Sequence, residues 1–116
     1  MVPSKEVQMI SGTENLKCFT QTHVLGAQVS VYFCGICGTC LYKQLHTPPF
    51  DQCFVVQSGT LDEVDGKLGA DLEPPDGEGY PELRAAWLPA VEGLPDVQKV
   101  QYPEYVDKIG QVPGRA

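Results

Sequence analysis

The hydrophobic positions of this chain fall into short runs rather than long periodic stretches. β-branched, aromatic and other apolar residues gather in segments about five residues long, and Gly, Pro, Ser or Asn bound them. The pattern predicts strands at Glu6–Ile10, Leu16–Thr20, Val29–Phe33, Leu41–Gln44 and Cys53–Gln57. Ten prolines and twelve glycines among 116 residues leave little room for long helices.

The predicted strands Val29–Phe33 and Leu41–Gln44 are separated by a segment rich in glycine and cysteine. Gly35 and Gly38 permit a tight turn there. We therefore predict a hairpin that carries cysteines at its tip.

The second half of the chain has a weaker pattern. Residues 62–79 are polar and rich in Gly and Pro, which predicts an acidic loop. Glu82–Leu88 favours a short helix, with Pro81 in its first turn. Together with the predicted strands, these features indicate one mainly β domain over residues 1–116. Its expected architecture is small packed antiparallel sheets with few short helical turns.

Composition places the chain among ordinary globular proteins, with 42% hydrophobic and 20% charged residues. No apolar run approaches the roughly 20 residues of a membrane helix. The first twenty residues lack the pattern of a secretory signal. These observations predict a cytoplasmic protein with no membrane partner.

The net charge of −7 is confined to the second half of the chain. Residues 61–116 carry twelve acidic and five basic residues, whereas residues 1–60 are balanced. Nucleic acids and anionic membranes are bound by basic patches, so the balance argues against both. An acidic, solvated loop explains most of this charge.

Five cysteines make an odd count, and three of them are closely spaced. In a reducing compartment such spacing indicates metal or redox chemistry rather than a disulfide framework. Cys34 and Cys37 form a C-x-x-C followed by glycine, a turn that lets two thiolates converge on one zinc ion. Thioredoxin-like redox chemistry is disfavoured because no βαβ pattern surrounds the motif.

Cys40 extends the motif to C-x-x-C-x-x-C. Three thiolates and a water would form an open site of the catalytic type. However, Cys40 is expected one step into the outgoing strand, which sets it apart from Cys34 and Cys37. The alternative is a set of reduced thiols at the tip of the hairpin, without metal.

Four other residues are candidates for a small-molecule pocket. His23 and His46 are the only groups whose usual pKa lies near neutrality, and both are expected at the same end of the hairpin. Arg84 could clamp a carboxylate, although pairing with a nearby acidic residue is the simpler interpretation. Trp87, the only tryptophan, could line a pocket or cover the core.

Four segments, taken in order, carry a resemblance to a known family. They are Ser11-Gly12-Thr13, Tyr32–Tyr42 (YFCGICGTCLY), Val56–Asp62 (VQSGTLD) and Arg84–Leu88 (RAAWL). The chain resembles the glutathione-dependent formaldehyde-activating enzymes, a family that includes centromere protein V, over roughly residues 3–100.

The resemblance implies a β-tent fold and carbon–sulfur lyase-like chemistry supported by two zinc sites. In the family an N-terminal C-x-C completes a structural zinc site with the later C-x-x-C, and a C-x-C-x-x-C run holds the second, catalytic-type zinc. The chain is expected to begin after both of these segments. Cys34 and Cys37 therefore correspond to half of the structural site. Cys18, Cys40 and Cys53 match no family ligand.

Three interpretations follow from this departure. Two copies could associate and rebuild a site, with two Cys34/Cys37 pairs sharing one zinc across a twofold axis. The shortened scaffold could serve metal-free lyase or isomerase chemistry on a carbonyl-bearing molecule, as accessory enzymes of biosynthesis do. The chain could also be an inactive member. We predict a small lyase or isomerase that forms a homodimer; the alternative is a non-catalytic zinc-binding or partner-binding module.

Overall fold

The computed structural model of the protein describes residues 1–23, 26–48, 50–72, 75, 77–94 and 99–100. The chain divides into two compact units, residues 1–72 and 73–116, and each is described by itself. No helix in these described residues has the length and hydrophobicity needed to cross a membrane.

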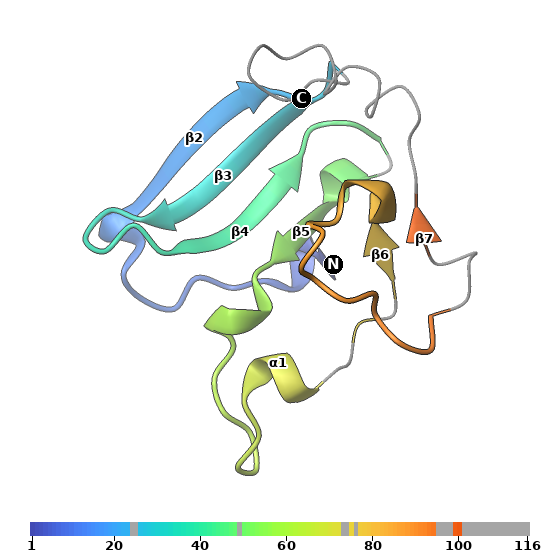
Figure 1. Cartoon of the computed structure of the whole chain (residues 1–116). Coiled ribbons are helices and arrows are strands. Elements are labelled where there is room, and N and C mark those ends of the chain that lie inside the picture. The colour runs from blue at the N-terminus through green and yellow to red at the C-terminus, as the bar shows by residue number, and fades with distance from the viewer. Residues whose placement is uncertain (24–25, 49, 73–74, 76, 95–98, 101–116) are drawn as a thin grey trace. The chain divides into compact units, whose positions relative to one another are not determined.

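The first unit is built on a five-stranded antiparallel sheet (Figure 1). The strand order is β1-β5-β4-β3-β2. The strands are β1 (Val2–Pro3), β2 (Leu16–Thr22), β3 (Gln28–Cys34), β4 (Cys40–Leu45) and β5 (Cys53–Val56). The mainly β class predicted from the short runs of β-branched, aromatic and other apolar residues is confirmed.

Short helical turns connect these strands. Four are 3-10 turns, at Ser4–Glu6, Thr13–Asn15, Phe50–Gln52 and Ser58–Thr60. An α-helical turn, α1, spans Gly69–Leu72. Before it, Asp65 and Gly66 both have positive φ and close a two-residue turn between Val64 and Lys67. Within the segment predicted as an acidic loop, residues 64–72 thus contain a tight turn and α1.

Four of the five predicted strands are confirmed, and the one at Glu6–Ile10 is wrong. The chain pairs with β5 only at Val2 and Pro3, and then turns away from the sheet. Ser4 fixes this turn by donating its hydroxyl hydrogen to the carbonyl of Gln52 at 3.1 Å. The alternation of Val7 and Met9 reflects one wall of a cavity rather than a strand.

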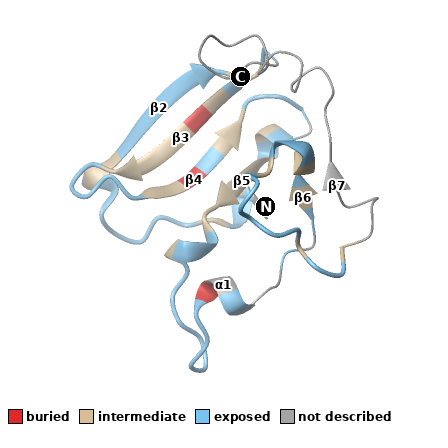
Figure 2. Ribbon diagram, viewed as in Figure 1, coloured by how far each residue is buried: buried red, intermediate tan, exposed pale blue. Residues whose placement is uncertain are grey.

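An aromatic stack holds the centre of the sheet together. Tyr42 on β4 stacks on Tyr32 of β3 with ring centroids 4.5 Å apart, and contacts Phe54 of β5 at 4.6 Å. Tyr42 is the one apolar side chain of the described residues that is buried. Figure 2 shows the few buried positions, on β3, β4 and α1. The core is thin.

A β-bulge distorts the pairing of β3 with β4. Tyr32 pairs with Tyr42, but Phe33 pairs with Cys40, so Leu41 is the extra residue. Two consecutive residues of β4, Leu41 and Tyr42, consequently line the same cavity, which a regular strand would not allow.

In the described residues of the second unit, 75, 77–94 and 99–100, regular structure is limited to two short strands and a 3-10 turn. Strands β6 (Glu78–Gly79) and β7 (Lys99–Val100) pair in parallel. The helix expected at Glu82–Leu88 is wrong: only a 3-10 turn at Pro81–Leu83 forms, although Pro81 does occupy its first turn. The residue before a proline avoids helical geometry, and Leu88 precedes Pro89, which works against a longer helix.

Candidate functional site

The C-x-x-C segment forms a closed turn between β3 and β4. The Cys34 amide donates to the carbonyl of Thr39 at 2.9 Å, and the Gly38 amide donates to the carbonyl of Cys34 at 2.8 Å. Gly38 has a φ of 77°, a left-handed conformation that favours glycine. We call residues 34–39 the knuckle.

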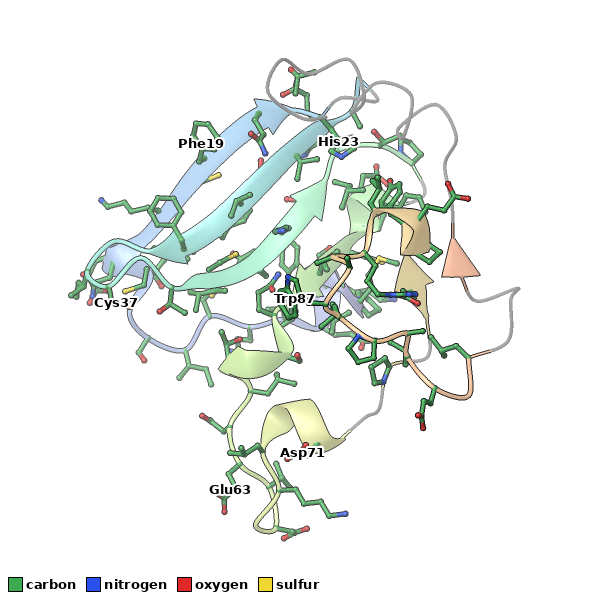
Figure 3. The ribbon with its side chains drawn as sticks, viewed as in Figure 1. Phe19, His23, Cys37, Glu63, Asp71 and Trp87 are labelled. Atoms are coloured by element: carbon green, nitrogen blue, oxygen red, sulfur yellow. The ribbon has the colours of Figure 1, made fainter. Side chains whose placement is uncertain are left out.

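The knuckle brings two thiols together. The Cys34 side chain lies close enough to Cys37 to contribute to the lowering of the pKa of the Cys37 thiol. The Ile36 amide donates to Cys34 Sγ at 3.4 Å, and Thr39 Oγ1 lies 3.1 Å from Cys37 Sγ. These Thr39 contacts, followed by the contact with Cys34, lower the pKa of the Cys37 thiol. Figure 3 shows Cys37 at the tip of the β3–β4 hairpin.

The Thr39 hydroxyl gives a testable pH dependence. The thiolate is the reactive form, so alkylation of Cys37 accelerates as pH rises through its pKa. In the reduced, metal-free protein we expect its midpoint below that of an ordinary cysteine. Thr39→Val removes the donor and should move the midpoint to higher pH, as measured by mass spectrometry of the Cys37 peptide. Thr60→Val, whose hydroxyl bonds a backbone carbonyl instead, is the control; equal midpoints in T39V and wild type would contradict this account.

Two adjoining cavities lie in the first unit, near the knuckle. The larger is about 240 Å³ and mainly apolar. Its lining is Val7, Met9, Ser11, Gly12, Thr13, Leu16, Leu41, Tyr42, Val56 and Thr60. The smaller, about 70 Å³, is lined by Gly12, Asn15, Leu16, Cys34 and Leu41. Because they share three lining residues, Gly12, Leu16 and Leu41, the two form one hollow with Cys34 at one end, and we call it the cleft.

The two histidines lie at the other end of the sheet. The His23 amide donates to the carbonyl of Ala27 in the β2–β3 connection, and the His46 amide donates to the carbonyl of Gln28 after β4. The prediction that both face one end of the hairpin is confirmed. Figure 3 shows His23 at the end opposite Cys37.

His46 takes part in a chain of hydrogen bonds that the sequence did not reveal. Its Nε2 lies 2.7 Å from Ser30 Oγ, and Ser30 Oγ lies 2.7 Å from Thr20 Oγ1. Ser30 is 3% exposed. The only sign of these hydrogen bonds in the sequence was a serine on an otherwise apolar strand. The strand register that pairs Ser30 with Thr20 could not be predicted from the sequence.

Ser30→Ala should lower the free energy of unfolding by about 1–3 kcal/mol, since it removes a buried hydroxyl that serves two partners. Thr22→Val removes an exposed side-chain bond to Gln28 from the neighbouring strand and should cost less. Urea unfolding of both variants measures the difference. If both variants lose the same free energy of unfolding, the buried hydrogen bonds of Ser30 contribute no more stability than an exposed one.

Arg84 and Trp87 belong to the second unit. Arg84 donates from Nε and Nη2 to the two carboxylate oxygens of Glu78, each at 2.8 Å, and this pairing raises its pKa. The simpler interpretation, an ion pair, is the one observed. Trp87 is 82% exposed. Neither residue, and neither histidine, lines the cleft.

Comparison with known proteins identifies the family. The family model of the glutathione-dependent formaldehyde-activating enzyme matches residues 1–76. The chain belongs to this family. No curated protein and no solved structure matches the chain. The link to centromere protein V stays a prediction.

Formaldehyde-activating enzymes typically bind zinc. The described residues of one copy of this chain do not form a zinc site. No three His, Cys, Asp or Glu side chains in the described residues gather closely enough to hold a metal. A structural zinc needs four ligands, and the knuckle offers two. Cys40 pairs with Phe33 in the sheet and does not complete a three-ligand group.

Proposed function

We propose that this formaldehyde-activating enzyme homologue catalyses the reversible addition of a small thiol to a carbonyl-bearing small molecule held in the cleft. Support comes from the family match, since all residues that line the cleft lie within the matched range. In the reverse direction the reaction is that of a carbon–sulfur lyase, of use as an accessory step in biosynthesis.

The reaction balances without a redox partner. The thiol sulfur bonds to the carbonyl carbon, the carbon–oxygen π pair moves to the oxygen, and the thiol proton ends on that oxygen. The reverse reaction breaks the carbon–sulfur bond and returns the proton to sulfur. An apolar cleft favours this step, because charge that develops on the oxygen interacts more strongly with a nearby donor when water is excluded.

Tyr42 is the observation that carries the proposal. It lines the cleft. A phenol, whose usual pKa is about 10, is protonated at neutral pH, and burial raises the pKa of Tyr42 further. A protonated phenol can donate a hydrogen bond to the developing alkoxide. In this proposal Tyr42 is the catalytic residue, and the apolar side chains of Val7, Leu41 and Val56 hold the substrate.

The test uses formaldehyde and glutathione, the two compounds in the family name, as probes. Exchange spectroscopy by NMR measures how fast the adduct forms and breaks, and we expect acceleration over buffer. Tyr42→Phe keeps the ring but loses the hydroxyl, and should lower kcat by about 10²-fold with little change in KM. Tyr32→Phe is the control, because Tyr32 belongs to the same stack but does not line the cleft. No acceleration by the wild type, or equal kcat in Y42F and wild type, would contradict the proposal.

A second candidate function is a non-catalytic zinc-binding module. The preformed knuckle favours it, as does the position of His23, His46, Arg84 and Trp87 outside the cleft. This function predicts zinc uptake by the thiols without any acceleration of thiol–carbonyl exchange.

A further inference from the structure

We propose that the cleft binds an uncharged aldehyde whose apolar substituent has about six to nine carbon atoms. For the role of the carbonyl group the inference rests on the proposed function, and it names the class of compound that the same cleft takes. It follows from the size of the cleft and from the side chains of its wall.

The cleft is large compared with the smallest carbonyl compounds. Its larger part has a volume of about 240 Å³. An apolar cavity of about 150 Å³ engineered in another protein binds benzene, a compound of six carbon atoms. Formaldehyde, with a single carbon, would leave most of the apolar wall in contact with water. In proportion to volume, a substituent of about six to nine carbons fills the cleft.

The wall of the cleft is mainly apolar. Its hydrocarbon and thioether surface comes from Val7, Met9, Leu16, Leu41 and Val56. None of the described residues that line the cleft has a charged side chain. A carboxylate or ammonium group buried there would lose its hydration without gaining a partner of opposite charge. The ligand that this wall favours is therefore uncharged.

The β-bulge of β4 places a polar group within this apolar wall. Because Leu41 is the extra residue, both Leu41 and Tyr42 line the cleft. In the reaction proposed above, the Tyr42 hydroxyl donates to the carbonyl oxygen, and the substituent contacts the apolar side chains. The Thr60 hydroxyl, also at the wall, donates instead to the carbonyl of Gln57 at 2.7 Å. A compound with one carbonyl and one apolar substituent matches this arrangement, and an aldehyde has that composition.

Met9 forms an accessible part of the apolar wall. It lies outside the sheet, between the 3-10 turns at Ser4–Glu6 and Thr13–Asn15. Its side chain lines the cleft and is 45% exposed. The next residue, Ile10, is 90% exposed and does not line the cleft. Neither side chain belongs to the buried core, so the two positions can be altered alike without removing core packing.

Binding is measured first with unreactive probes, so that it does not depend on catalysis. The straight-chain primary alcohols from propanol to octanol have no carbonyl group and cannot add a thiol. NMR titration of the full chain gives their dissociation constants, and we expect affinity to rise about two- to fourfold with each methylene. Hexanoate, a charged compound of the same length as hexanol, should bind at least about tenfold more weakly. Affinity that does not change with chain length, or equal affinity for hexanol and hexanoate, would overturn the proposal.

Aldehydes of increasing length then test the link to the reaction. With glutathione as the thiol, whose charged groups stay outside the cleft, kcat/KM should rise along the series from formaldehyde to octanal. If alcohol affinity rises with length but no aldehyde is accelerated, the proposed reaction fails and the apolar, uncharged class of ligand is supported. If all aldehydes are accelerated equally, the reaction stands and the present proposal is overturned.

Two variants place the ligand in the cleft. Met9→Gln keeps the length of the side chain but gives the wall a polar amide, so it should lower the affinity for octanol about three- to tenfold. Ile10→Gln makes a comparable change one residue away and outside the cleft, and should leave this affinity unchanged. Equal octanol affinities in M9Q and I10Q would show that octanol binds elsewhere, and this would overturn the proposal.

Discussion

Tyr42→Ala should lower the free energy of unfolding by about 3–5 kcal/mol, the range measured when a large buried aromatic side chain is truncated. Tyr42 is the buried apolar residue of the described chain, and both Tyr32 and Phe54 pack against its ring. Removing it leaves the two outer rings without a common partner. A small domain is stable by only about 5–15 kcal/mol, so this loss is a large fraction of the whole.

Chemical unfolding followed by circular dichroism measures this effect. Phe19→Ala is the matched control, since Phe19 is an aromatic residue of the same sheet whose side chain is 58% exposed. It should cost well under half as much. If the two variants lose equal stability, the aromatic stack is not the centre of the fold.

The contrast between Tyr42→Ala and Tyr42→Phe connects stability with function. The alanine variant removes the stack and, in our proposal, the donor; the phenylalanine variant removes the donor alone. A protein that folds as Y42F but no longer accelerates thiol–carbonyl exchange would assign the hydroxyl a chemical role. Such a result cannot be explained by loss of structure.

The strands of the central sheet were predictable because their physical cause is local. Val29–Phe33 is rich in β-branched and aromatic residues, and glycines mark the turn that follows, so the hairpin could be predicted from one local segment at a time. Strand β1 gave no comparable signal. It spans two residues, one of them Pro3, and exists only because β5 pairs with it.

The candidate site was only partly predictable, since it depends on register and on distant segments. The C-x-x-C spacing was enough to predict that Cys34 and Cys37 would meet. The cleft was not foreseen, because it needs the bulge at Leu41 and the departure of Val7 and Met9 from the sheet edge. The contact of His46 with Ser30 likewise depends on the pairing of three strands.

Gly69→Ala should destabilise the first unit by about 2 kcal/mol, although alanine is the better helix former. Gly69 is buried and begins α1. A Cβ there would overlap Leu61 Cβ, and would lie 2.9 Å from the carbonyl oxygen of Ser58 and 3.0 Å from that of Leu61. Two of these atoms belong to the backbone and cannot rotate away.

Whether Gly69→Ala stabilises or destabilises the protein depends on two opposing contributions, helix propensity and steric overlap. Replacing glycine by alanine in a helix contributes about 0.5–1 kcal/mol of stability. Forcing a methyl group into a filled site costs about 1–3 kcal/mol, and more where backbone must move. Steric overlap with three atoms at once places Gly69 at the upper end of that cost, so destabilisation wins.

Gly59→Ala is the control for this prediction. Nothing lies within 4 Å of a Cβ at Gly59, which belongs to the 3-10 turn that packs against α1. Its stability should stay within about 0.5 kcal/mol of wild type. Thermal and urea unfolding of the two variants compare the same chemical change in filled and open space. If G69A proves as stable as G59A, then α1 does not pack against Ser58–Thr60 in solution, and residues 58–72 are held by the chain on either side instead.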